Sequence, residues 1–525
     1  MNRAPKRRPF PNRRKRQFLP IQMLQRFNWN VFEDFSAFQT YLNIAVIAYV
    51  VLIVWNIAFE GKFVESVSSA IVIGSVYVSL KLWCDQKVTG LPIFPISVFT
   101  CVYTFGLQFL IFDTFTDMKD RYFADSSDIF YSSIIVASYI LSGTLVWYLF
   151  LRKPSPPPQK CYQIVSGSMD TLFLVCFVIT SLFTAAIATE KFINLGRFYP
   201  VFRAITGTLS ILSSFVLSYH IGQRSLPKFK STIFLVFLVL QIVANCASLL
   251  LIGALTSGVV VVLGYTLGRH RLPWIALLIC FPIFFILHQG KAEMREKYWH
   301  QERAVQSVQF LDYPKFFLEW FDFGIKNLNQ SEEEKEQRAD LLERTSLLQV
   351  LLTAQLMSPE IVPHLNGKSY NFLHLMLVPR FLNPNKFSSH ESTTRLNIHY
   401  LIQTREMTLA TTIGWGLLNE AYANFAIWGT ILVGGIMGWL FALVTRLSSN
   451  VPILSFPGLL GILTISFAFQ SEYTSSAFIS SYFQACVALF LLRVALMKSL
   501  PNPFATQVVG RTKPTRSVMR RRAQP

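Results

Sequence analysis

The sequence predicts an all-α integral membrane protein with about 11–12 transmembrane helices and one large, partly helical extracytoplasmic loop between the ninth and tenth. Of its 525 residues, 52% are hydrophobic and only 15% are charged, and the mean hydropathy is +0.40. Soluble globular proteins carry about a quarter charged residues. This chain has more apolar side chains than one aqueous core can bury, so a bilayer must serve as part of its solvent. The composition excludes a soluble enzyme, a disordered chain and a secreted disulfide scaffold.

The transmembrane helices are predicted from apolar runs that are long enough to cross about 30 Å of hydrocarbon. Nine runs precede the large loop, at residues 41–59, 64–83, 92–113, 129–151, 170–188, 201–222, 231–247, 250–268 and 272–289. Three runs follow it, at residues 417–446, 452–470 and 475–497. The stretch 231–268 has two interpretations: two short helices that turn near Asn245–Ser248, or one broken helix. The total number of helices depends on which of them holds.

Basic residues predict the orientation of the chain in the membrane. Residues 1–30 contain nine Lys/Arg and no acid, and residues 498–525 contain seven and no acid. Basic segments beside membrane helices stay in the cytoplasm and bind anionic headgroups. We therefore expect a multi-pass protein of the plasma (inner) membrane, with cytoplasmic tails at 1–40 and 498–525. No base-reading or stacking module accompanies the charge, so nucleic acid is not an expected partner. The short loops expected on the cytoplasmic side are Lys81–Lys87, Arg152–Lys160, Gln223–Lys230, Gly268–Arg271 and Thr445–Asn450.

The same alternation places residues 290–412 outside the cytoplasm, between the membrane parts 41–289 and 413–497. This stretch is far longer than an ordinary connection and contains 15 acids and 14 bases. We expect it to be a folded, nearly neutral loop that carries the active site. Within it, Ser331 and Glu334 form a capping box that predicts a helix through Leu352. An aromatic cluster suits either the membrane interface or packing within the loop: Phe310, Phe316, Phe317, Trp320, Phe321 and Phe323.

The candidate chemistry comes from cations in the outer stretch. Phosphate-cradling glycine loops, zinc-binding motifs and nucleophile elbows are missing from the sequence, so we expect neither a metal nor a cofactor. Guanidinium groups bind phosphate bidentately and ammonium groups neutralise it, which suits a lipid diphosphate. The cations are Lys291, Arg295, Arg344, Arg380 and Lys386. The alternative for Lys291 and Arg295 is snorkelling at the membrane edge, and for Arg344 it is a pair with Asp340.

Glu420 is the first candidate for a general base. It lies at the entrance to the run 417–446, and Asn424 follows one helical turn later on the same face. A carboxylate at the edge of hydrocarbon is costly unless it faces the bundle interior or a wet cavity, where it suits proton transfer. The alternative is a glutamate that hydrogen-bonds to the loop. His364 is the second candidate for the base. Gly434 and Gly438 have the spacing of close helix packing, more often within one chain than between two.

Three segments of the outer stretch, taken in order, resemble a known family. They are Pro359-Glu-Ile-Val-Pro363-His-Leu-Asn-Gly367-Lys-Ser-Tyr370, Leu377-Val-Pro379-Arg380-Phe-Leu-Asn-Pro384-Asn-Lys386 and Asn419-Glu420-Ala-Tyr422-Ala-Asn424-Phe-Ala426. Behind Lys291-x-x-x-Arg295 and an Arg344-bearing helix, this order resembles the oligosaccharide repeat-unit polymerases of the O-antigen polymerase type, which are related to the O-antigen ligases. The resemblance covers about residues 290–440. Ala426 departs from the pattern, which has Gly there, and we expect the added methyl group to matter little.

The resemblance implies a metal-independent glycosyltransferase that acts outside the cytoplasm on polyprenyl-diphosphate-linked glycans. A hydroxyl at the non-reducing end of an incoming unit would attack the anomeric carbon of the growing chain and release polyprenyl diphosphate. Membrane lipids, chain-length regulators and export proteins are the implied partners. The expected catalytic residues are Arg295, Arg344, Arg380 and Glu420, and the expected substrate-binding residues are Lys291, His364, Tyr370, Lys386, Tyr422 and Asn424.

Three other functions remain open at this point. A ligase would use the same chemistry to move a finished glycan onto a different acceptor. A transporter of lipid-linked glycans would be expected to bury charges at the membrane midplane in broken helices, whereas here the apolar runs are nearly free of charge. A scaffold or sensor would use the outer stretch only as a docking surface.

Overall fold

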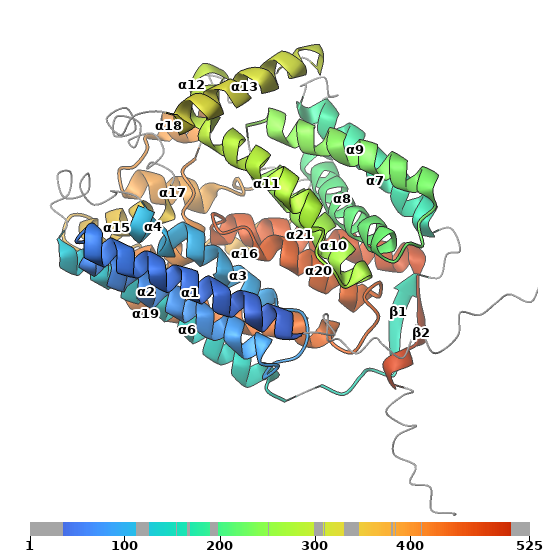
Figure 1. Ribbon diagram of the computed structural model, residues 1–525, viewed down its shortest axis with the longest axis horizontal. Helices are drawn as coiled ribbons and strands as arrows, with labels where there is room; N and C mark the ends of the chain where they lie inside the picture. The colour runs from blue at the N-terminus through green and yellow to red at the C-terminus, as the bar shows by residue number, and fades with distance from the viewer. Residues whose placement is uncertain are drawn as a thin grey trace, which may run out of the picture.

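The computed structural model describes residues 35–111, 125–153, 155–164, 169–188, 198–249, 251–298, 308, 310–329, 346–379, 382–383, 385–410 and 412–505. In this part the chain is a bundle of helices with one two-stranded sheet at its edge (Figure 1). The first helices are α1 (Phe35–Phe59), α2 (Phe63–Cys84), α3 (Ile93–Cys101), η2 (Val102–Gly106), α4 (Gln108–Ile111), α6 (Ser126–Leu151), α7 (Met169–Ala188), α8 (Tyr199–Gly222), α9 (Lys228–Ala247), α10 (Leu251–Arg269) and α11 (Trp274–Gln289). The outer stretch contains α12 (Lys291–Tyr298), η4 (Phe310–Asp312), α13 (Tyr313–Leu328), α15 (Leu347–Met357), α16 (Leu373–Met376), α17 (Glu391–His399) and α18 (Arg405–Ala410). The last elements are α19 (Gly416–Ser448), α20 (Phe456–Ala468) and α21 (Ser475–Leu496), and the strands are β1 (Lys160–Ile164) and β2 (Met497–Pro501).

Ten helical segments of the described chain are long and apolar enough to cross a membrane. They are α1, α2, the continuous stretch from α3 to α4, α6, α7, α8, α9, α10, α19 and α21. The pair α11 and α12, bent by 52°, would be an eleventh span if taken together. The all-α membrane class is therefore confirmed, and the stretch 231–268 forms two helices, α9 and α10. The run predicted at 452–470 forms α20 of 13 residues, which is shorter than the roughly 20 residues that a full span needs.

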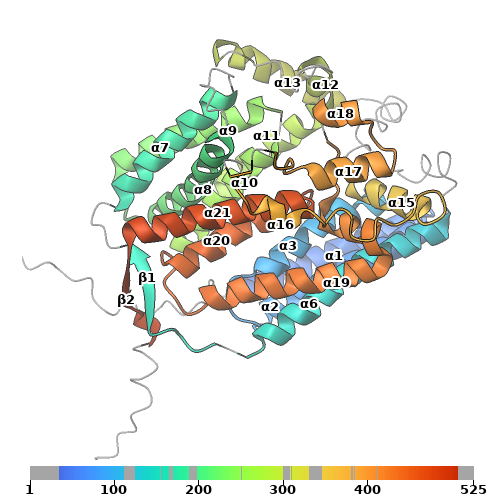
Figure 2. The same ribbon diagram turned by 180° about the vertical axis from the view of Figure 1, so that it is seen from behind.

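Glycines lie in the extensive contact between α6 and α19, which run side by side (Figure 2). A Cβ atom on Gly434 would lie 2.3 Å from the Tyr139 carbonyl oxygen, and one on Gly438 would lie 2.2 Å from the Gly143 carbonyl oxygen. Such small residues let two helix backbones approach closely without lipid between them. The Gly434/Gly438 spacing therefore makes an intrachain contact, as the sequence favours.

The helices α7 to α10 are joined by a buried polar group. The Gln241 amide donates to Ser210 Oγ at 2.7 Å, and its oxygen accepts from Ser181 Oγ at 3.0 Å. Ser257 Oγ of α10 lies 3.3 Å from the same amide nitrogen. An amide with all its hydrogen bonds formed holds the helices together, because separating them would leave it without partners in hydrocarbon.

Hydrogen bonds join two of the loops predicted to be cytoplasmic to the start of the C-terminal tail. Asn450 Nδ2 donates to the Ser155 carbonyl at 2.9 Å, and Asn502 Nδ2 donates to the carbonyls of Pro158 and Asn450 at 2.8 and 2.9 Å. Strand β2 pairs antiparallel with β1 beside them. The α12, α13, α15, α17 and α18 helices lie at the opposite end of the bundle (Figure 1). Two of the loops predicted to be cytoplasmic, 152–160 and 445–450, are therefore joined at one end of the bundle.

A kink in α19 changes the expectation for Ala426. This residue has φ +51° and ψ −147°, a conformation that glycine adopts freely and side-chain-bearing residues rarely adopt. The kink frees two helix carbonyls, so that the backbone N–H groups of Leu365 and Asn366 donate to Ala423 and Asn424 at 3.0 and 3.1 Å. The expectation that the extra methyl group matters little is therefore wrong, because a glycine would suit this backbone better.

Candidate functional site

Two predicted site residues, Lys291 and Arg295, lie one helical turn apart on α12, directly after the bend between α11 and α12. The bend is made at Gly290, where a Cβ atom would lie 2.7 Å from the Gly324 backbone nitrogen of α13. Trp320 Nε1 of α13 donates to the Leu287 carbonyl at 2.7 Å. The aromatic cluster of the outer stretch thus packs in part within the protein, because Phe316 and Trp320 are both buried against the α11–α12 corner.

The Arg295 side chain is also fixed from the opposite side. Its Nη2 donates to the Leu249 carbonyl at 3.1 Å, in the turn between α9 and α10. Lys291 and Arg295 are both half-buried rather than extended into open solvent. Snorkelling alone leaves the head group in water, so the bond to Leu249 supports a fixed guanidinium at Arg295, with Lys291 half-buried one turn before it.

A carboxylate that sequence reasoning missed, Glu472, lies near enough to these two cations for its charge to act on both. It interacts electrostatically with both Lys291 and Arg295 and lies in the turn between α20 and α21. Its backbone carbonyl accepts from Gly416 N at 3.1 Å. We call Lys291, Arg295 and Glu472 the charge cluster. One feature of the sequence could have drawn attention to Glu472: it is the only acidic residue that follows Glu420.

Further polar side chains surround the charge cluster. Tyr103 of η2 interacts electrostatically with Glu472. Burial and the Glu472 charge raise the pKa of Tyr473, whereas the Arg203 guanidinium lowers it. Burial and the positive charge of Arg203 both lower the pKa of His390. Residues from η2, α8, α12, the α20–α21 turn and the start of α17 therefore share one electrostatic environment.

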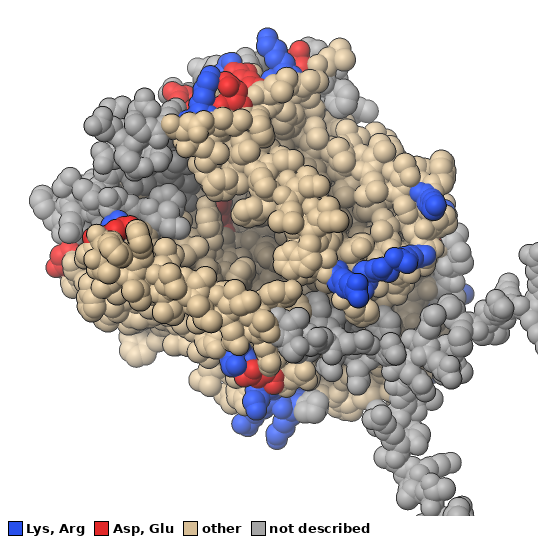
Figure 3. All heavy atoms as spheres, in the orientation of Figure 1, with Lys and Arg blue, Asp and Glu red and all other residues tan. Residues whose placement is uncertain are grey.

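One face of the molecule is hollowed. Figure 3 shows a hollow between α11 and the α1–α3 side of the bundle, with an acidic side chain visible inside it. Glu472, Arg203 and His390 are exposed to solvent even though protein surrounds them. A solvent-reachable recess with convergent polar groups is where a ligand site is expected.

Glu420 lies on the other side of the α20–α21 turn and is fully buried, with 0% of its surface exposed. Its carboxylate accepts hydrogen bonds from Ser369 Oγ and Ser475 Oγ, both at 2.8 Å, and from Ser475 N at 2.5 Å. The alternative interpretation, a glutamate hydrogen-bonded to the loop, matches this geometry. The carboxylate joins α19, the loop at 369 and the start of α21.

Asn424 extends this arrangement on the same helix face, as its spacing predicts. Its Nδ2 donates to Ser369 Oγ at 2.8 Å, and its Oδ1 accepts from Gly367 N at 2.9 Å. Tyr370 stacks on Phe425 with ring centroids 6.3 Å apart. Burial and the nearby Glu420 charge raise the pKa of Tyr370. These contacts brace the loop against α19.

The other predicted residues lie apart from the charge cluster or outside the described chain. His364 packs edge-on against Tyr422, with centroids 5.9 Å apart. Lys386 Nζ donates to the carbonyls of Met376 and Val378 at 2.5 and 2.8 Å, so it ties its own loop together. Arg344 and Arg380 lie outside the described residues, as does the predicted capping box of Ser331 and Glu334.

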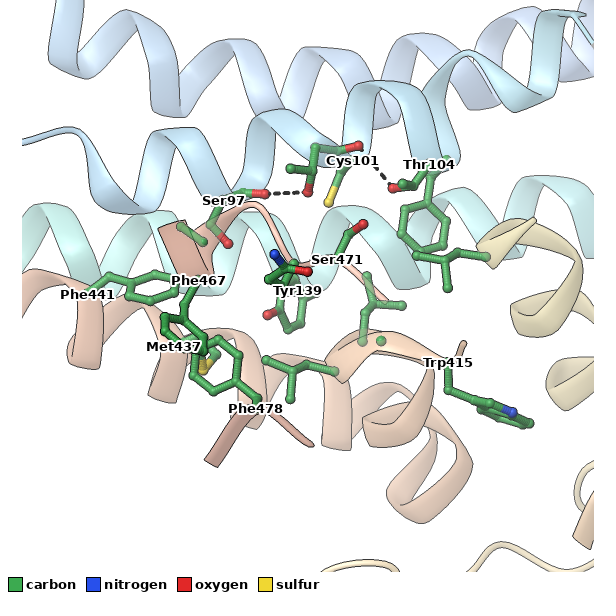
Figure 4. A pocket seen from close by; sticks show the side chains of 18 residues that line it. Ser97, Cys101, Thr104, Tyr139, Trp415, Met437, Phe441, Phe467, Ser471 and Phe478 are labelled. Carbon is green, nitrogen blue, oxygen red and sulfur yellow. Dashed lines mark hydrogen bonds between the residues drawn. The ribbon is translucent and has the colours of Figure 1, made fainter. Parts of the chain in front are cut away.

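A small cavity adjoins the α20–α21 turn (Figure 4). Its volume is about 50 Å³, and Ser97, Tyr139, Phe467 and Ser471 are among its lining residues. That space holds only a few water molecules. Thr100, which also lines it, donates its hydroxyl to the Ser97 carbonyl at 2.7 Å. The cavity is therefore too small for a sugar ring, and the hollow in Figure 3 is the better candidate for a substrate site.

Among the described residues, no three His, Cys, Asp or Glu side chains are grouped so that they could hold a metal ion. No family model, curated protein or solved structure matches this chain.

Proposed function

We propose that this protein is a membrane-embedded glycosyltransferase of the plasma membrane. In this proposal it joins polyprenyl-diphosphate-linked oligosaccharide repeat units on the outer face and releases polyprenyl diphosphate. The observation that supports it most is the pair of cations, Lys291 and Arg295, held on the polar helix α12 directly after the apolar helix α11. A lipid diphosphate has its charge at the same depth, just beyond its hydrocarbon chain.

The chemistry follows from that placement. The acceptor hydroxyl oxygen forms a bond to the anomeric carbon, while the bond from that carbon to the diphosphate oxygen breaks. The electron pair of the broken bond leaves on the diphosphate. Fixed cations that face developing negative charge usually supply the largest catalytic contribution. The hydrogen bond from Arg295 to the Leu249 carbonyl and the contact of α13 with the end of α11 support this role.

The distribution of charge in the helices favours this function over transport. The charged side chains of the spans lie near their ends, such as Glu65 in α2, Asp170 in α7 and Arg493 in α21. A transporter is expected to place ionisable groups near the membrane midplane. Chemistry at the membrane surface fits the observed pattern better.

The experiment is a reconstitution of the full-length protein in phospholipid vesicles. The substrate is the lipid-linked repeat unit extracted from a strain in which the gene is deleted, and the readouts are glycan length and released polyprenyl diphosphate. Replacing both Lys291 and Arg295 by Ala should slow the release by at least about 10²-fold. Lys326→Ala is the matched control, because Lys326 is an exposed cation of α13 that pairs with Asp322.

The deletion strain separates the competing functions. Single-unit or shortened glycan supports the polymerase. Full-length polymer that stays unattached would indicate a ligase, and lipid-linked units that remain on the inner side would indicate a transporter. Either of the last two results would overturn the proposal.

A further inference from the structure

Glu472 occupies an unusual position in the chain and in the fold. No other acidic residue follows Glu420 over the remaining hundred or so residues, although three apolar helices and a basic tail lie there. Glu472 lies in the short turn between α20 and α21, at the same end of the bundle as the outer stretch. Glu472 is therefore the one acidic side chain in an otherwise apolar and basic C-terminal part of the sequence.

The backbone around Glu472 is fixed by contacts on both sides. Before it, Gln470 Nε2 donates to Thr256 Oγ1 in the second turn of α10 at 3.1 Å. After it, Ser475 N and Oγ donate to the buried carboxylate of Glu420. The Glu472 carbonyl itself accepts from Gly416 N at 3.1 Å. The turn therefore holds its one carboxylate in a defined place.

The side chain of Glu472 is directed by a glycine. A Cβ atom on Gly414 would lie 2.9 Å from Glu472 Cβ and 3.3 Å from Glu472 Oε2. Any larger residue at 414 would push the carboxylate away. Gly414 thus leaves room for the Glu472 side chain beside it, and Glu472 is exposed to solvent.

Arg295 and the turn that carries Glu472 are both tied to the start of α10 or to the residues just before it. Arg295 bonds the Leu249 carbonyl immediately before α10, and Gln470 bonds Thr256 within α10. Glu472 interacts electrostatically with Lys291 and Arg295, and among the described residues it makes no ion pair within 4.0 Å. The separation is therefore larger than that of a direct ion pair.

We propose that Glu472 is the catalytic base of the proposed glycosyl transfer, so this inference rests on the proposed function. The acceptor hydroxyl lies between Glu472 and the cations, and its oxygen bonds to the anomeric carbon as the diphosphate departs. Its proton passes to the Glu472 carboxylate and from there to water. The charged and titratable groups that face Glu472 are Lys291 and Arg295 from α12, Tyr103 from η2 and the adjacent Tyr473.

The competing role for Glu472 is that of a counterion for the two cations. The two roles differ in what the isosteric change Glu472→Gln does. Removal of a base leaves lipid diphosphate bound and slows turnover, typically by about 10²–10⁴-fold. Removal of a counterion increases the net positive charge around the diphosphate, so it strengthens binding and leaves turnover near wild type.

The test compares Glu472→Gln, Glu472→Asp and Glu360→Gln in the full-length protein in phospholipid vesicles. Glu360 is an exposed glutamate of the outer stretch outside the charge cluster, so Glu360→Gln is the matched control. The substrate is the extracted lipid-linked repeat unit, and kcat, KM and the pH dependence of kcat/KM are measured. Binding is measured separately with polyprenyl diphosphate in phosphatidylcholine vesicles, and a melting curve checks the folding of each variant.

We expect Glu472→Gln to lower kcat by at least about 10²-fold and to bind polyprenyl diphosphate at least as well as wild type. In Glu472→Gln, kcat/KM should no longer fall as the pH is lowered. Glu472→Asp should retain part of the activity and should still show this fall. A kcat within about threefold of wild type in Glu472→Gln would overturn the proposal. An equal loss of binding and of turnover would also overturn it.

The two proposals fail in different ways. If wild-type protein transfers no glycan, the proposed function fails and the role of Glu472 fails with it. If wild-type protein is active and Glu472→Gln is equally active, the function stands and only the base is misassigned.

Discussion

The carboxylate of Glu420 accepts hydrogen bonds from both the backbone N–H and the hydroxyl of Ser475, the first residue of α21. A negative charge at a helix N-terminus is favourable because the first N–H groups have no partner within the helix. This contact fixes the end of the α20–α21 turn, and therefore the position of Glu472 three residues earlier. Glu420 thus affects the candidate site by holding the α20–α21 turn in place.

Replacing Glu420 by Ala should lower the free energy of unfolding by about 3 kcal/mol, because Ser475 N and the hydroxyls of Ser369 and Ser475 would lose their acceptor in a buried place. Thermal unfolding of the purified protein in detergent measures this loss. Glu391→Ala, which removes only a half-exposed pair with Arg395, should change the unfolding free energy by less than about 1 kcal/mol. A fully stable Glu420→Ala protein without transferase activity would instead support the role as a general base.

Replacing Ala426 by Gly should stabilise the protein by about 1 kcal/mol. The residue has a positive φ of 51°, which a glycine adopts without the strain that a Cβ atom causes. The matched control is Ala423→Gly in the same helix, three residues before the kink. That change should destabilise by about 1 kcal/mol, so the two substitutions should shift the melting temperature in opposite directions. A loss of stability in both variants would contradict the assigned backbone.

Replacing Gly438 by Ala should destabilise the protein by about 2 kcal/mol or more, because the new Cβ would lie 2.2 Å from the Gly143 carbonyl oxygen and force α6 and α19 apart. Gly435→Ala is the control on the same helix. A Cβ atom there would meet Val146 Cγ2 at 3.6 Å, an ordinary contact. Melting curves of the two variants should therefore differ clearly, and equal melting temperatures would show that the packing of α6 on α19 is not the limiting contact.

The stability of the protein should depend on pH through His390. Burial and the Arg203 charge lower the pKa of His390 in the folded state, so the folded protein binds fewer protons than the unfolded chain. The stability that neutral His390 contributes is then fully present above about pH 6.5, the pKa of histidine in the unfolded chain. It is lost as the pH falls below that value. The melting temperature of His390→Gln should fall less between pH 7.5 and 5.5 than that of wild type. His374→Gln, which leaves this environment intact, should keep the wild-type pH dependence, and an unchanged slope in His390→Gln would refute the coupling.

Much of the fold was determined by the sequence alone because its signals are local. A run of about 20 apolar residues specifies a spanning helix wherever it lies, and the structure has a helix at each predicted run. The spacing of Glu420 and Asn424 placed both on one helix face, where both bond Ser369. The pair Gly434 and Gly438 likewise indicated close packing before its partner helix was known. Lys291 and Arg295 were predicted as site residues because cations directly after an apolar run are visible in the sequence.

Only the tertiary structure decided which distant groups meet. Glu472 lies more than 170 residues after Arg295, and no sequence period links a turn between two late helices with a bend after α11. The roles of Glu420 and Ala426 also depended on the fold, because burial and a positive φ arise from how the loop at 365–370 packs against the α19 kink. Arg344 and Arg380 stay predictions. A sequence specifies local periodicity and polarity, whereas a site built from several chain segments exists only once packing has brought those segments together.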